Sequence, residues 1–175
     1  MAHITSRRCG SLRSVCSLTP LRRCRAPPCS TPSTQPALAL QHFRLTHELA
    51  APGTRTHDAG AAFGARVAVL LDQPGLAAEL IEPSVDRWIR NREITFTDIT
   101  LAIGAALALA QESPVDARML AEVARTTTVS QIFRELIAHL DEKLDPAVQS
   151  TRPLTYDEAL AKAAEYVRAA GAHHV

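Results

Sequence analysis

Residues 99–110 are apolar around the whole circumference of a helix, and this feature restricts the fold most. The segment reads ITLAIGAALALA and contains no charged residue. A helix without a polar face must be covered by protein on all sides, unless it lies in a membrane. The run is shorter than the roughly 18 apolar residues that a membrane span needs. We therefore expect residues 99–110 to form the central helix of a bundle.

Amphipathic segments on both sides supply helices to surround this run. The clearest covers residues 129–144, where apolar side chains recur every three or four positions and Pro146 follows. Pro74 and Pro83 predict interruptions further upstream, with Ser84 as the cap of a separate segment. Residues 93–101 would also suit a strand, but the alanines that follow favour a helix. The sequence predicts an all-α fold, a single compact bundle of five or six helices.

Helix starts are marked by side chains that can accept hydrogen bonds from free backbone N–H groups. Asp58 is predicted to cap the first helix of the domain. Capping boxes are predicted at three further starts, which are Thr95–Asp98, Ser113–Asp116 and Thr155–Glu158. Separately, Gly60 and Gly64 form a small-residue pattern that predicts a close approach of two helices.

Charge divides the chain at about residue 57. Residues 1–56 contain eight arginines and one glutamate, for a net charge of +7, whereas residues 57–175 contain eleven basic and seventeen acidic residues, for a net charge of −6. The first part is rich in Arg, Ser, Pro and Cys, which predicts a disordered basic N-terminal arm. The second part, residues 57–175, is predicted to be the acidic helical domain.

Three interpretations of residues 1–56 remain open. The composition is that of an organellar transit peptide, of an arm that contacts nucleic acid phosphates, or of a tail encoded by an over-extended start. All four cysteines lie in this segment, and their spacing does not favour a structural zinc site. We expect a cytoplasmic protein, or one of an organellar matrix if the arm is a transit peptide.

The candidate binding residues of the domain cluster around its only tryptophan. Arg87, Trp88, Arg90 and Arg92 form the one basic cluster in the acidic part. Tryptophan and arginine dominate binding hot spots, so these residues are the first candidates for a binding site. The competing interpretation turns Trp88 into the core and leaves the arginines in water.

A helix-turn-helix interpretation applies to residues 114–144, with the second helix presenting Ser130, Gln131 and Arg134 to DNA. The turn lacks a glycine, and the net charge of −6 disfavours DNA binding.

Glu135 and His139 lie one helical turn apart, but two ligands do not make a metal site. No metal and no cofactor is therefore expected.

No motif of a catalytic site is present, so an enzyme is not expected. The leading hypothesis is a small helical protein-interaction or regulatory module that binds a protein partner or forms a homo-oligomer, with no membrane partner. The alternatives are a helix-turn-helix DNA-binding regulator and a small-ligand-binding domain with its pocket beside Trp88.

Overall fold

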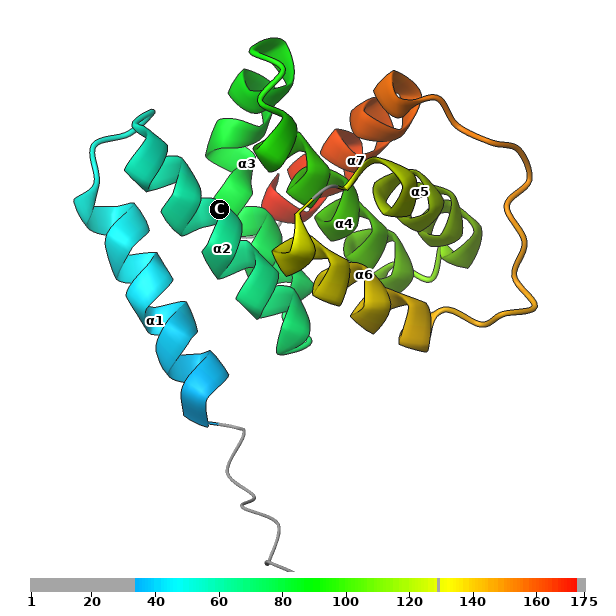
Figure 1. Cartoon of the computed structure of the whole chain (residues 1–175), viewed down its shortest axis with the longest axis horizontal. Coiled ribbons are helices and arrows are strands. Elements are labelled where there is room, and N and C mark those ends of the chain that lie inside the picture. The colour runs from blue at the N-terminus through cyan, green and yellow to red at the C-terminus, as the bar shows by residue number, and fades with distance from the viewer. Residues whose placement is uncertain (1–33, 129, 173–175) are drawn as a thin grey trace, which may run out of the picture. The chain divides into compact units, whose positions relative to one another are not determined.

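The computed structural model of the protein describes residues 34–128 and 130–172, and within these ranges the secondary structure is entirely helical (Figure 1). The predicted arm up to residue 33, with all four cysteines, lies outside the described residues. The helices are α1 (Thr34–Leu49), α2 (Arg55–Leu70), α3 (Pro74–Arg90), α4 (Ile94–Ala110), α5 (Pro114–Thr127), α6 (Gln131–Lys143) and α7 (Tyr156–Gly171). No helix in the described part is long and apolar enough to cross a membrane.

The predicted central helix is confirmed. Every residue of α4 from Phe96 to Ala108 is buried, and α4 packs against α2, α3, α5, α6 and α7. The contact with α7 is close, because a Cβ atom placed on Gly104 would lie 2.5 Å from the Cβ atom of Ala163. The strand alternative for residues 93–101 is wrong.

The bundle has more helices than the five or six predicted, and the additional one is α1. This helix occupies residues 34–49, which were predicted to belong to the disordered arm. Its apolar positions Leu40 and Phe43 pack toward α2, where Gly60 faces the backbone of His47. A Cβ atom on Gly60 would lie 2.8 Å from the His47 backbone nitrogen, so the prediction of a close helix contact at this glycine pair is confirmed.

Helix α3 is continuous through Pro83, so the predicted interruption is wrong. Pro83 is exposed, while Leu80, Ile81 and Val85 on the opposite side are buried. Proline removes one backbone hydrogen bond, but the apolar face on both sides of it holds the helix together. Ser84 is consequently a buried residue inside α3 and not a cap.

The predicted caps have mixed outcomes. The Thr155–Glu158 capping box is confirmed with both of its hydrogen bonds. Ser113 is the N-cap residue of α5 but makes no side-chain cap bond, and the carboxylate of Asp116 pairs with Lys162 at 2.8 Å. The remaining two predictions are wrong, since α2 is capped by Thr54 and α4 begins at Ile94, with Asp58 and Asp98 buried inside their helices.

The turns that follow α2, α3 and α4 share one geometry, although the sequence shows no repeat. Asp72, Arg92 and Glu112 have φ values of 59°, 52° and 57°. In each turn the next N–H donates to the carbonyl oxygen five residues earlier, at 2.8 Å, 3.0 Å and 2.8 Å. This is the Schellman pattern of helix termination. The three turns lie before α3, between α3 and α4, and after α4.

Candidate functional site at the turn between α3 and α4

The four basic-cluster residues lie at the end of α3 and in the following turn, and they differ in exposure. Trp88 is fully buried and stacks on Phe96, with the ring centroids 4.8 Å apart. Arg87 is partly buried, whereas Arg90 and Arg92 are exposed. Trp88 thus supports the turn from the core, and the arginines form the surface.

Arg87 is held by the buried carboxylate of Asp58 in the first turn of α2. Its Nη1 and Nη2 atoms donate to Asp58 at 2.7 Å and 2.5 Å, and Ser84 Oγ donates at 3.3 Å. Burial acts to raise the pKa of Asp58, but the hydrogen bonds and charge of Arg87, together with the nearby Trp88 and His57 side chains, outweigh burial and hold that pKa below its usual value. The ionised pair ties α2 to α3.

A cavity of about 430 Å³ opens beside this pair, where the connection before α2 meets the turn after α3. Its cationic groups are Arg55, Arg87 and Arg92, and its acids are Asp58 and Glu93. Arg87 forms an ion pair with Asp58, whereas neither Arg55 nor Arg92 makes an ion pair with any described residue. We call this the arginine cavity, and its two unpaired guanidinium groups suit a carboxylate.

A second cavity of about 510 Å³ lies on the other side of the same turn and shares Arg92 and Ile94 with the first. We call it the tyrosine cavity, after Tyr156. Its apolar lining comes from α3, α4 and α7 and consists of Ile89, Ile94, Leu160 and Ala161. Ile94 stands between the two cavities with 67 % of its surface exposed. An apolar group and an anionic group of one ligand can therefore bind next to each other, one in each cavity.

Behind the tyrosine cavity lies a buried acid. The hydroxyl of Tyr156 forms a hydrogen bond of 2.7 Å with Thr97 and lies 3.5 Å from Oδ1 of Asp98, which is 3 % exposed. Burial raises the pKa of Asp98 to about 6, against a smaller lowering by the hydrogen bond from Tyr156. No local sequence pattern indicates this contact, because 58 positions separate its partners.

The residues of the helix-turn-helix alternative lie at the start of α6. Ser130 is the N-cap residue of α6, and Gln131 and Arg134 are exposed. Arg134 lines a separate cavity of about 490 Å³ with the threonines that end α5. A contact of these three residues with DNA stays a prediction.

Glu135 and His139 do not combine into a metal centre. Glu135 pairs with Arg66 of α2, whereas His139 faces Asp72. Across residues 34–128 and 130–172, no group of three or more His, Cys, Asp or Glu side chains is placed to hold a metal ion.

No protein-family model, no curated protein and no solved structure matches this chain.

Proposed function

We propose that this protein is a protein-interaction module that uses the turn between α3 and α4 to hold a partner segment. The segment presents an apolar side chain to the tyrosine cavity and an acidic side chain to the arginine cavity. The observation that carries the proposal is the exposed Ile94, which stands between an apolar cavity and two unpaired arginines. Arginine is enriched in binding hot spots, and an exposed isoleucine beside it adds apolar surface that a partner can bury.

The apolar half of the contact supplies affinity. Burying the exposed part of Ile94 contributes about 1–2 kcal/mol, given about 1.5–3 kcal/mol for the burial of a whole side chain of this size. A partner side chain that fills the tyrosine cavity contributes a similar amount. Together these terms support binding of moderate strength by a short segment.

The charged part of the contact determines the orientation in which the partner segment binds. Arg92 faces both cavities, so an acid held by Arg92 fixes which end of the segment enters the tyrosine cavity. Arg55, at the start of α2, adds a second positive charge on the same side. An acid next to an apolar residue in the partner meets both requirements.

Selection from a random peptide library displayed on phage tests the proposal. We expect the full chain to enrich peptides with an acidic residue within a few positions of a large apolar residue. The variants Ile94→Asp and Arg92→Glu should abolish that enrichment. Arg90→Glu is the matched control, because Arg90 is exposed at the same helix end but lines neither cavity.

Failure to enrich any shared motif would refute the proposal. So would a motif that both variants retain, because the peptides would then bind elsewhere on the protein. A motif that is lost in Arg90→Glu to the same degree would point to general charge attraction rather than to the two cavities.

Self-association is a second part of the proposal, and α1 supports it. Leu38, Leu45 and Leu49 are 53 %, 50 % and 77 % exposed. Their spacing of seven and four positions places them along one side of α1, a pattern typical of helix pairing. We expect a concentration-dependent dimer in light scattering that Leu45→Glu weakens, and a strict monomer at high concentration would contradict this part.

A further inference from the structure

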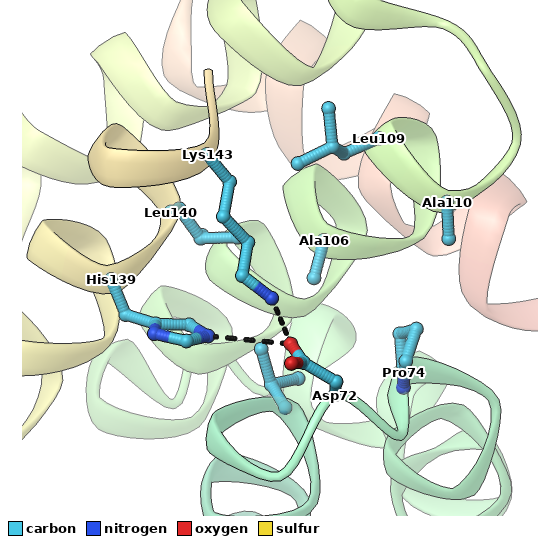
Figure 2. A pocket seen from close by; sticks show the side chains of 9 residues that line it. Asp72, Pro74, Ala106, Leu109, Ala110, His139, Leu140 and Lys143 are labelled. Carbon is cyan, nitrogen blue, oxygen red and sulfur yellow. Dashed lines mark hydrogen bonds and ion pairs between the residues drawn. The ribbon is translucent and has the colours of Figure 1, made fainter.

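Another pocket, distinct from the cavities described above, lies between the ends of α2 and α4 and the last turns of α6 (Figure 2). Its volume is about 300 Å³. The walls are apolar side chains from these helices and the start of α3, namely Val69, Pro74, Ala106, Leu109, Ala110 and Leu140. We call it the lysine pocket, because Lys143 reaches across its mouth.

The polar end of the lysine pocket consists of three side chains. His139 and Lys143 lie one turn apart on α6, and both are directed at the carboxylate of Asp72 (Figure 2). The Nζ atom of Lys143 pairs with Oδ1 of Asp72, and Nε2 of His139 lies 3.6 Å from the same oxygen. That nitrogen is buried and has no hydrogen-bond partner among the described residues. Two nitrogen groups thus converge on one carboxylate oxygen at the edge of an apolar space.

We infer that the lysine pocket binds a small apolar monocarboxylate. The Asp72 oxygen marks the position where the carboxylate of the ligand is held, between Lys143 and His139. The apolar part of the ligand then lies against Ala106 and Leu140. A volume of about 300 Å³ suits a ligand of this size.

The side chain of Asp72 can be displaced by such a ligand. Its side chain is 67 % exposed, and it lies in a surface turn rather than in a helix. An ion pair this exposed contributes only about 0–1 kcal/mol, so a ligand carboxylate that also buries an apolar chain can displace it. A cationic ligand is disfavoured, because it would meet the ammonium group of Lys143.

Titration of the full-length chain with hexanoate, followed by two-dimensional ¹H–¹⁵N NMR, tests the inference. We expect saturable shifts at Val69, Ala106 and Ala110, with a dissociation constant of about 1 mM or lower. The neutral analogue hexanamide should bind more weakly by about two- to fivefold, because it lacks the charge that Lys143 recognises.

Two substitutions make opposite predictions. Lys143→Met should weaken hexanoate binding by about two- to fivefold, because the charged partner is lost. Asp72→Asn should strengthen it by about two- to fivefold, because asparagine tolerates the positive φ of Asp72 and removes the competing carboxylate. Lys162→Met is the matched control, since Lys162 makes a similar lysine–aspartate pair with Asp116 on α5 and should leave the affinity unchanged.

Shifts confined to other surfaces, or no saturation at millimolar hexanoate, would overturn the inference. Equal affinity for hexanoate and hexanamide would do so as well. Weaker binding in Asp72→Asn would show that Asp72 holds the ligand instead of occupying its place. Ile94→Asp should leave hexanoate binding unchanged, so failure here and failure of the proposed function are distinguishable.

Discussion

The buried carboxyl of Asp98 makes folding stability depend on pH, and Asp98→Asn measures the effect. In the folded chain the pKa of this group is raised by burial from 3.8 to about 6. Between those values the folded state binds more protons than the unfolded state, so stability falls as the pH rises. The difference corresponds to about 3 kcal/mol at most, at about 1.4 kcal/mol for each unit of pKa.

Asparagine has a similar shape and cannot ionise, so it avoids this loss. We expect Asp98→Asn to be about 2–3 kcal/mol more stable than the wild type at pH 7.5, and nearly equal to it at pH 3.5, where Asp98 is protonated. The oxygen of the amide can still accept the hydrogen bond from Tyr156. Urea denaturation monitored by circular dichroism at pH values between 3.5 and 8 gives the difference directly.

Asp157→Asn is the control, because Asp157 lines the tyrosine cavity, in front of Asp98, but is exposed. It should change the free energy of unfolding by less than about 0.5 kcal/mol. The reasoning is refuted if Asp98→Asn is less stable than the wild type at pH 7.5, or if the two differ by the same amount across the whole pH range.

Three further substitutions test the packing and the turns, each by urea denaturation. Arg87→Met should cost about 2–3 kcal/mol, because it leaves the Asp58 carboxylate buried without its partner, and Asp58→Asn in the same chain should recover part of that loss. Gly104→Ala should cost about 1–3 kcal/mol, because its Cβ atom meets Ala163, and Ala163→Gly should recover part of this loss. Glu112→Gly should gain about 0.5–1 kcal/mol, because glycine adopts the φ of 57° without strain, whereas Glu112→Ala should gain nothing.

The parts of the fold that rest on local pattern could be predicted from the sequence. Residues 99–110 form the central helix because a segment with no polar face has only the interior as a stable position. The Thr155–Glu158 capping box forms because both of its hydrogen bonds join neighbouring residues. Helix α1 was missed because the arginine-rich composition upstream concealed its short apolar face toward α2.

The candidate site depended on contacts that join distant segments. Asp58 and Asp98 have the residue type and spacing of helix caps, but both are buried, and their partners Arg87 and Tyr156 lie on other helices. The basic cluster at the end of α3 was visible in the sequence. The grouping of Arg92 with Arg55 and Ile94 around two cavities depends on how α2 and α4 pack against α3.

The helices α2 to α5 also determine where the two proposed binding sites lie relative to each other. Because the turns at Asp72 and Arg92 lie before and after α3, these two residues belong to opposite ends of that helix. The tyrosine cavity uses the first turn of α4 up to Thr97, and the lysine pocket uses its last turns from Ala106. At about 1.5 Å per residue, about 14 Å of helix separates these positions. Sites at this distance that share no lining residue should respond independently, so the effects of Ile94→Asp and Lys143→Met should be confined to their own ligands.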